Sequence, residues 1–381
     1  MRKIAVVTGT RAEYGYLKPL MTEIQKDKDL ELIPVVTGMH LLPQHGNSCK
    51  IVEKDFPNTK KVPMKLLGDS HKDMADYLSF GIKSLVEFFE KTKPDIVTAL
   101  GDRSEAFAAT ISSTYLNIPF AHINGGDVSG TTIDESIRHA ITKLSHIHLV
   151  HNKTNAARVE KMGEEKNRIY VTGALTLDVI HQSKLMNRKE LFEKHGLSPD
   201  KTTFLVVHHP ITTLKDQGYS EMKELFLALD ALKTQTVLIY PNCDAGSKKF
   251  IDLIKKYEKK DYIYTFENLE HLDYLSFMKN CEVMLGNSSS GIIEAPSFKI
   301  PVINIGTRQQ GRERSDNVID VTPEKDKILK KIDFALNDKK FQEKLSKCKN
   351  KFGDGKASLR IVKIFKEVEI SEKLIQKQIT Y

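Results

Sequence analysis

Cysteine is scarce in this chain, and long apolar runs are absent. The four cysteines lie far apart among 381 residues and form no C-x-x-C pair, so disulfides and cysteine-bound zinc are not expected and a reducing cytoplasm fits. No stretch approaches about 18 continuous apolar residues, so no membrane-spanning helix is expected. The first residues, Met1 to Gly9, enter a short strand too soon to act as a secretion signal.

Several catalytic motifs are also absent. The sequence has no G-K-[ST], no G-x-S-x-G and no H-E-x-x-H, which disfavours P-loop ATPases, serine hydrolases and zincin proteases. His146, His148 and His151 are close in sequence, but their spacing is not that of a zinc site. We therefore expect an enzyme that needs neither a metal ion nor another cofactor.

The formal charge of +8 does not predict a nucleic-acid partner. Lysines are dispersed among acids, as in Lys248-Lys249 and Lys255-Lys256, and no basic run with interleaved aromatic residues occurs. A solvated, lysine-rich surface explains the excess charge. Such a surface is compatible with the attraction of a small anionic substrate.

Short β-branched runs alternate with amphipathic stretches, in two sets separated by a polar segment at 187–202. This alternation, with continuous apolar strands, is typical of parallel sheets covered on both faces. Because 381 residues exceed what one core usually serves, we expect two doubly wound α/β domains. We assign 1–182 to an N-terminal domain, 183–355 to a C-terminal domain, and 356–381 to a helical segment that packs back on the first.

The predicted strands are Ile4–Thr8, Ile33–Thr37, Ile96–Leu100, Phe120–Ile123, Ile147–Val150, Ile169–Thr172, Phe204–His208, Thr236–Tyr240, Tyr262–Thr265, Val283–Leu285 and Val302–Ile305. The predicted helices include Tyr16–Ile24, Lys72–Glu90, Ser104–Leu116, Asp134–Leu144, Glu221–Leu232 and Leu272–Met278. Open α/β sheets bind ligands at the carboxyl ends of their strands, so the loops at these ends are the candidate site.

The segment GNSSSGIIE, from Gly286 to Glu294, follows a predicted buried strand and precedes a possible helix at Ile292–Phe298. Small residues at such a junction let an anionic group approach backbone N–H groups, so Ser288 and Ser289 are candidates for phosphate binding. Glu294 is placed to accept hydrogen bonds from a ribose diol, and the two features together indicate a nucleotide. A plain strand-to-helix turn with serine as N-cap explains the segment equally well.

Two arginines lie in further strand-end loops. Arg11 lies in TGTRAEYG after the first strand, and Arg308 lies in GTRQQGRE after the last. The guanidinium fork of donors matches phosphate oxygens, so both are candidates for binding a diphosphate. An ordinary surface arginine is the alternative for Arg11, because its turn is neither a Walker motif nor a dinucleotide fingerprint.

Two carboxylates are candidates for proton transfer. Asp102 lies in GDRSE at the end of a predicted strand, beside Arg103, and Asp134 begins a predicted helix. Two carboxylates in different environments suit a reaction that removes and returns a proton. The alternatives are an N-cap role for Asp102 and a favourable helix-dipole interaction for Asp134.

Three more loops carry polar candidates. Asn124 and Asp127 lie in HINGGDVSG, whose small residues predict a loop folded tightly over a ligand. His209 follows His208 at a strand end, and since successive strand residues point to opposite faces, only one histidine is expected to reach the site. Asn242 lies in PNCDAGS after the next strand.

Taken in order, these loops resemble the hydrolysing UDP-N-acetylglucosamine 2-epimerases of sialic-acid synthesis. The motifs that carry the resemblance span residues 8 to 314, which is nearly the whole chain. They are TGTRAEYG, GMH-x5-GN, KPDI-x4-GDRSEA, HINGGDVSGT-x-IDESIRHAITK, HHP-x-TT, PNCDAGS, GNSSSG and PVINIGTRQQGRE.

The resemblance implies two Rossmann-like domains in a GT-B arrangement, with the active site in the interdomain cleft. It implies conversion of UDP-N-acetylglucosamine and water to N-acetylmannosamine and UDP, by elimination through 2-acetamidoglucal and hydration. Together with the frequency of two-fold oligomers, it indicates a homodimer or higher homo-oligomer. The charge pattern and the short apolar runs described above predict no nucleic-acid or membrane partner. The resemblance has Asp102, Asp134 and His209 as its implied catalytic residues. Its implied substrate-binding residues are Arg11, Arg103, Asn124, Asp127, Asn242, Ser288, Ser289, Glu294 and Arg308.

One residue departs from the family pattern. Related epimerases often carry a glutamate where this chain has Asn124, and an amide does not transfer protons at useful rates. Either Asp102, Asp134 or Asp127 takes that role, or Asn124 only orients the sugar. A second substrate, UDP-2,4-diacetamido-2,4,6-trideoxyglucose of legionaminic-acid synthesis, fits most of the same motifs. A GT-B glycosyltransferase and a non-catalytic nucleotide-sugar sensor are the alternatives of other classes.

Overall fold

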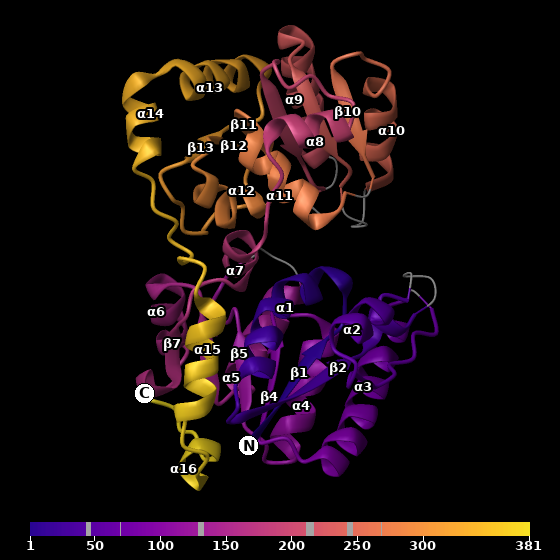
Figure 1. The fold of residues 1–381 in the computed structure, drawn as a ribbon, viewed down its shortest axis with the longest axis vertical. Coiled ribbons are helices and arrows are strands. Elements are labelled where there is room, and N and C mark those ends of the chain that lie inside the picture. Colours follow the sequence, from indigo (N-terminus) through magenta and orange to yellow (C-terminus); the bar gives the residue numbers. More distant parts are fainter. Residues whose placement is uncertain (43–46, 69, 129–132, 211–216, 242–246, 268) are drawn as a thin grey trace. The chain divides into compact units, whose positions relative to one another are not determined.

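The computed structural model describes residues 1–381 except 43–46, 69, 129–132, 211–216, 242–246 and 268. The chain forms two compact units, each with a parallel sheet and flanking helices (Figure 1). Unit 1 comprises Met1–Asp127, Ile133–His181 and Phe352–Tyr381, and unit 2 comprises Val128–Thr132 and Gln182–Lys351. The expected pair of doubly wound α/β domains is confirmed.

The sheet of unit 1 has the strand order β3-β2-β1-β4-β5-β6-β7. Its strands are β1 (Arg2–Thr8), β2 (Leu30–Val36), β3 (Lys60–Lys61), β4 (Ile96–Leu100), β5 (Phe120–Ile123), β6 (Ile147–Val150) and β7 (Ile169–Val171). Its helices are α1 (Arg11–Lys26), α2 (Cys49–Asp55), α3 (His71–Thr92), α4 (Ser104–Tyr115), α5 (Ile133–Leu144), α6 (Lys153–Lys161), α7 (Leu175–Gln182), α15 (Ala357–Glu367) and α16 (Glu372–Ile375), with short 3-10 turns η1 (Gly38–Leu41) and η3 (Lys166–Arg168).

Both faces of this sheet are covered, because alternate residues of its strands enter different cores. Ile4 of β1 packs in a core with Leu17 of α1, whereas Ala5 packs in a second core with Phe89 of α3. Side chains alternate across a strand with a period of two, so each core covers one face. Continuous burial of β1 on both faces explains why its sequence reads as an unbroken apolar run.

Helix α15 belongs to unit 1 although it lies near the end of the chain. Ile361 and Phe365 are fully buried in the same core as Ile4 and Leu17, and α15 runs alongside α1 (Figure 1). The buried Asp178 carboxylate of α7 accepts the first N–H groups of α15, from Ala357 at 2.9 Å and Ser358 at 2.7 Å. A helix leaves its first N–H groups without internal partners, so this carboxylate satisfies two of them.

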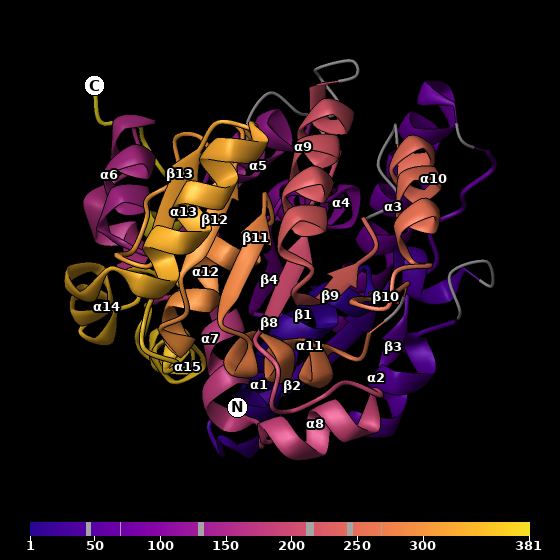
Figure 2. The same ribbon diagram turned by 90° about the horizontal axis from the view of Figure 1, so that it is seen from above.

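The sheet of unit 2 has the strand order β10-β9-β8-β11-β12-β13, which runs from right to left in Figure 2. Its strands are β8 (Thr203–Val207), β9 (Gln235–Ile239), β10 (Ile263–Phe266), β11 (Val283–Gly286), β12 (Val302–Ile305) and β13 (Val318–Val321). Its helices are α8 (Arg188–Lys194), α9 (Gln217–Leu232), α10 (Ser247–Tyr257), α11 (His271–Asn280), α12 (Ser290–Ile293), α13 (Lys325–Asn337) and α14 (Lys339–Ser346), with the 3-10 turn η4 (Ala295–Phe298).

This second sheet is also covered on both faces. Val206 of β8 packs in a core with residues of α9, α10 and α13, whereas Leu205 packs in another with residues of α8 and α11. The polar segment expected to link the domains therefore contains a helix. In α8, Leu191 and Phe192 are fully buried, and two apolar residues in a polar stretch were too weak a signal to predict it.

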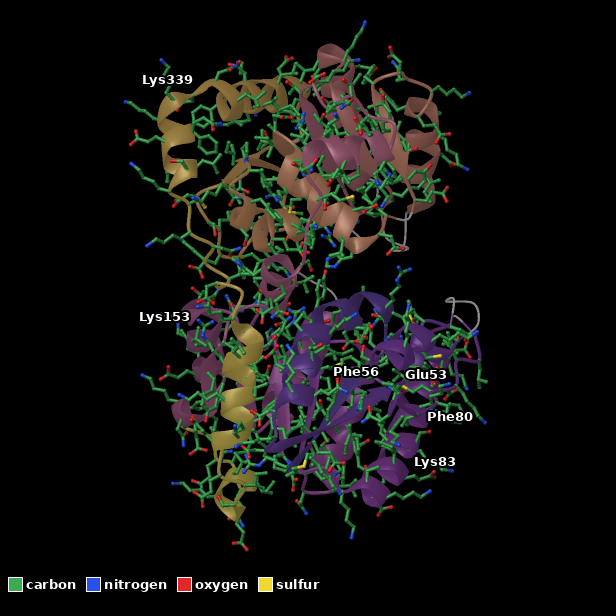
Figure 3. The ribbon with its side chains drawn as sticks, viewed as in Figure 1. Glu53, Phe56, Phe80, Lys83, Lys153 and Lys339 are labelled. Atoms are coloured by element: carbon green, nitrogen blue, oxygen red, sulfur yellow. The ribbon has the colours of Figure 1, made fainter. Side chains whose placement is uncertain are left out.

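Three lysines illustrate the solvated surface that the composition predicts. Lys83, Lys153 and Lys339 are exposed and extend away from α3, α6 and α14 into solvent (Figure 3). No helix within the described ranges is long and apolar enough to cross a membrane.

Candidate active-site groups in each unit

Several of the predicted site residues follow the strands at which each sheet reverses its order. In unit 1 the order reverses between β1 and β4, which carry the loops of Arg11 and Asp102. In unit 2 it reverses between β8 and β11, which carry the loops of His209 and Ser288. A crevice forms outside the carboxyl ends of strands at such a point, so ligands of open α/β sheets bind there.

Asp102 forms an ion pair with Arg138 of α5. Arg138 is buried with 5% of its side chain exposed, whereas 24% of the Asp102 side chain is exposed. The same guanidinium donates from Nη1 to Glu135 Oε2 at 2.6 Å and to the backbone oxygen of Asp127 at 3.2 Å. In this pair Asp102 accepts from Arg138 through its Oδ2 atom. Its Oδ1 atom accepts no hydrogen bond from any residue that the structure describes.

His122 holds the backbone of the loop that carries Asp102. Its Nε2 lies 2.8 Å from the oxygen of Gly101, and its Nδ1 lies 3.1 Å from Thr142 Oγ1. Burial lowers the pKa of His122 to about 3, so the ring is neutral. Because a carbonyl only accepts, the single proton of the neutral ring is on Nε2. This histidine is structural, and it fixes Gly101, whose φ of 80° favours glycine.

Asn124 adopts a left-handed conformation with φ 71° and pairs with His151 at the end of β6. His151 is buried, whereas Asn124 is half-buried, so the amide lies nearer to solvent. Asp127, three residues later, is buried, and its backbone oxygen bonds to Arg138. Asp134 is exposed in the first turn of α5.

Buried acids lie beneath the loops of Arg11 and Arg103, which are both exposed. Glu105 of α4 is buried, accepts from Tyr77 Oη at 2.8 Å and lies 3.4 Å from Arg103 Nε. Glu13 of α1 is also buried and accepts from the N–H of Gly9 at 2.8 Å. Burial, and after it the nearby charge of Glu105, raises the pKa of Glu13 to about 8, so Glu13 is neutral at pH 7.

In unit 2, Gly286 and Asn287 join the ends of β11 and β8. Gly286 has φ 129°, and a Cβ atom there would lie 2.1 Å from the oxygen of Val207, so no larger residue fits. The fully buried Asn287 side chain accepts from His209 N at 2.7 Å and donates to His209 O at 2.9 Å. This amide thereby fixes the backbone of His209, which is half-buried.

The serine turn forms a chain of hydroxyl groups. Ser288 Oγ lies 2.9 Å from Ser290 Oγ, which in turn contacts Tyr274 Oη at 2.5 Å. Burial, followed by the charge of Glu294, raises the pKa of Tyr274. Glu294 itself is 4% exposed, and burial raises its pKa to about 7. A carboxyl held in this way loses its proton more easily when hydroxyl donors reach it.

The helix predicted after this turn is broken. The structure has α12 only over Ser290–Ile293, then Glu294, then the 3-10 turn η4 with Pro296 near its start. Four residues build little macrodipole, so any phosphate at Ser288 and Ser289 depends on individual donors instead. The nearby Arg308 donates to the oxygen of Asn287 at 3.2 Å.

Each unit thus brings part of the predicted set together. Asp102, Arg103, Asn124 and Asp127 lie in the strand-end loops of unit 1. Ser288, Arg308 and His209 lie in those of unit 2, and Glu294 follows the short helix α12 after Ser288. Asn242 lies outside the described residues. Sequence reasoning missed Arg138, Asn287 and Glu105, since each acts through a partner distant in the chain. The part of the chain that the structure describes contains no group of three or more metal-binding side chains.

The family model that matches this chain is described as UDP-N-acetylglucosamine 2-epimerase and covers residues 22–366. A UDP-N,N'-diacetylbacillosamine 2-epimerase (hydrolyzing) of Legionella pneumophila is 38% identical over 99% of both chains. A GDP/UDP-N,N'-diacetylbacillosamine 2-epimerase (hydrolyzing) of Campylobacter jejuni is 38% identical over 84% of both. A UDP-N-acetylglucosamine 2-epimerase of Neisseria meningitidis is 35% identical over 90% of this chain and 89% of its own.

The fold agrees with this assignment. A solved structure titled UDP-GlcNAc 2-epimerase from Neisseria meningitidis bound to UDP-GlcNAc superposes with a TM-score of 0.79 at 20% identity, covering 96% of this chain and all of the other. The match to the Legionella relative covers 99% of this chain and so extends over both units. This chain therefore belongs to the UDP-N-acetylglucosamine 2-epimerase family.

Proposed function

We propose that the protein is a hydrolysing 2-epimerase of UDP-sugars whose substrate is UDP-2,4-diacetamido-2,4,6-trideoxyglucose. The observation that carries the choice of sugar is the likeness to the Legionella relative over 99% of both chains, since that relative is named for the same diacetamido sugar. This reverses the sequence-based order of preference, in which UDP-N-acetylglucosamine came first. The products are UDP and the corresponding 2,4-diacetamido-2,4,6-trideoxymannose.

The proposed reaction has two halves. A base removes the proton from carbon 2, the C1–O bond breaks, and UDP leaves with the electron pair to give a 2-acetamidoglycal. Water then adds its oxygen to carbon 1, and a proton returns to carbon 2 on the opposite face. The overall change is one UDP-sugar and one water in, one free sugar and one UDP out.

Unit 1 supplies the acid–base groups in this proposal. Asp102 suits contact with the sugar because its carboxylate is partly exposed and one of its oxygens is engaged by Arg138 while the other is not. Asp134 is exposed in the first turn of α5, the helix that also carries Arg138. Asn124 is hydrogen-bonded to His151, and this fixed amide supports a role for Asn124 in orienting the sugar. Arg103 and Asp127 would complete the sugar-binding groups of this unit.

Unit 2 supplies the nucleotide-binding groups and His209. Ser288, Ser289 and Arg308 would bind the diphosphate and stabilise its charge as it leaves. Arg11 of unit 1 is proposed as a further phosphate contact on sequence grounds alone. Glu294 would accept hydrogen bonds from the ribose hydroxyls, and its raised pKa supports this, because diol donors stabilise the ionised form that burial disfavours. Asn242 is proposed as a further substrate contact on sequence grounds alone.

A side-by-side assay tests both the reaction and the sugar. The protein is incubated with each of the two UDP-sugars in deuterated water, UDP release is followed, and products are identified by NMR. We expect kcat/KM to favour the diacetamido sugar, and we expect deuterium at carbon 2 of the product. Product without deuterium there would exclude elimination, and UDP binding without release from either sugar would exclude a catalytic role.

UDP-N-acetylglucosamine is the second candidate substrate. It is favoured by the Neisseria meningitidis relative, whose name carries that sugar and whose identity to this chain is only slightly lower. A larger kcat/KM for UDP-N-acetylglucosamine, with N-acetylmannosamine as product, would select it. We also propose a homodimer, which light scattering at micromolar concentration checks.

A further inference from the structure

Arg138 connects two loops of unit 1 that carry candidate catalytic groups. Its Nη2 atom bonds to Asp102, after β4, while its Nη1 atom bonds to the backbone oxygen of Asp127, after β5. Arg138 lies in the segment IDESIRHAITK but is not among the site residues predicted from the sequence. Because the guanidinium is rigid and planar, bonds from both Nη atoms fix the two loops relative to each other.

The arginine is itself fixed before any substrate arrives. Its side chain is 5% exposed and also pairs with Glu135 Oε2 at 2.6 Å, one turn earlier on α5. The charges of Asp102, Asp127 and Glu135 outweigh the effect of burial and raise the pKa of Arg138, so the group is always a cation. A buried cation held by several acceptors has few alternative rotamers, and so has the carboxylate that it holds.

We propose that Arg138 is a positioning residue for the reaction: it holds the Asp102 carboxylate in one orientation toward the sugar and ties it to the loop after β5. This inference rests on the proposed function for the identity of the reacting sugar. Arg138 engages Oδ2 of Asp102, so Oδ1 is the oxygen presented to the substrate. A reacting group misplaced by about 1 Å costs about a hundredfold in rate, which sets the scale of the effect.

The decisive comparison is Arg138→Met against Arg158→Met. Arg158 of α6 also donates to a backbone oxygen of the loop after β5, that of Gly126, but it contacts no candidate catalytic carboxylate. We expect Arg138→Met to lower kcat about a hundredfold with little change in KM or in UDP affinity, because the proposed phosphate contacts lie elsewhere. Arg158→Met should keep kcat within about threefold of the unmodified protein.

Two further variants separate positioning from a general loss of structure. Arg138→Lys keeps the positive charge, but a single ammonium nitrogen does not reproduce the bonds from two Nη atoms to Asp102 and to the oxygen of Asp127. The lysine variant should therefore have a kcat between those of Arg138→Met and the unmodified protein. On the Asp102→Asn background, Arg138→Met should cause almost no additional loss, since residues that act as one unit are not additive. Losses that multiply in the double variant, or equal rates for Arg138→Met and Arg158→Met, would overturn the proposal.

A readout without turnover keeps this inference separate from the proposed function. Hydrogen exchange of the segment around Gly101–Arg103 should be faster in Arg138→Met than in Arg158→Met, because the loop after β4 loses its contact through Asp102 and keeps only the one that His122 makes with Gly101. Unchanged exchange would overturn the inference even if the enzyme turns over. A third outcome is faster exchange in Arg138→Met together with an unmodified protein that releases UDP from neither sugar. That outcome would overturn the proposed function and leave the anchoring role intact. Should Arg138→Met prove insoluble, Arg138→Gln carries the same comparison.

Discussion

Replacing Glu13 by glutamine should stabilise unit 1 increasingly between about pH 5 and about pH 8, and it should remove a slope from the profile of stability against pH. Glu13 lies buried under the β1–α1 loop, and its carboxyl accepts from the N–H of Gly9 at 2.8 Å. Its pKa is about 8 in the folded protein, against 4.5 for the exposed group. Each pKa unit is worth 1.36 kcal/mol, so the difference corresponds to about 4–5 kcal/mol.

The sign follows from proton binding. Between pH 4.5 and about pH 8 the folded protein keeps the proton on Glu13 while the unfolded chain releases it. Where the folded state binds more protons than the unfolded state, the free energy of unfolding falls as pH rises. Glu13 therefore makes unit 1 progressively less stable across that window. Glutamine keeps an acceptor for Gly9 and never ionises. The variant and the unmodified protein should therefore agree near pH 4.5 and diverge by about 3–5 kcal/mol at pH 8.5.

Urea unfolding at a series of pH values measures this difference. Because proteins of two units need not unfold in one step, the readout must belong to unit 1. Cys49 is a buried free thiol of α2 in that unit, so its labelling after equilibration at each urea concentration reports the unfolding of unit 1. Glu31→Gln, at an exposed glutamate of β2, is the matched control. A Glu13→Gln profile parallel to that of the control would refute the reasoning.

Three other outcomes are expected. Asp102→Asn should lower turnover by about two to four orders of magnitude and leave UDP affinity unchanged in calorimetry; full activity would remove Asp102 from proton transfer and favour Asp134 or Asp127. Arg308→Ala should weaken UDP binding by about 1.5–3 kcal/mol, whereas Arg314→Ala, in the same loop but paired with Asp320, should not; equal affinities would contradict the phosphate role. Asp178→Asn should lower the stability of unit 1 by about 1–3 kcal/mol in the Cys49 assay, because one of the two α15 N–H groups loses its acceptor; an unchanged midpoint would show that water replaces it.

Strands with strong apolar signals were predictable, and weak edge strands were not. The predicted segment Ile96–Leu100 coincides with β4, whose residues are buried on both faces. In contrast, β3 is only Lys60–Lys61 and exists through pairing with β2, while β13 alternates buried and exposed residues around Asp320 at the sheet edge. Pairing partners decide such strands, and a single sequence does not contain that information locally.

The strand-end loops were predictable as a site, but their internal supports were not. Asp102 and Ser288 follow clear strands, and their loops carry small residues that favour a ligand. Arg138 is 36 residues from Asp102 and looks like any arginine of an amphipathic helix until the fold brings the two together. Glu13 and Glu105 look like ordinary acids of a first helical turn, where the dipole favours them, and only tertiary burial reveals their role.

The return of the chain to unit 1 has a consequence for synthesis on the ribosome. Unit 2 lies between two parts of unit 1 in sequence, so most of its residues leave the ribosome before Ile361 and Phe365 do. Domains usually fold in the order of their synthesis, but the core on one face of the first sheet is complete only after α15 has been synthesised. Until then the face of β1 that carries Ile4 lacks the apolar cover of α15. We therefore expect the nascent chain to expose this apolar surface while unit 2 is synthesised, and such a surface is of the kind that chaperones bind.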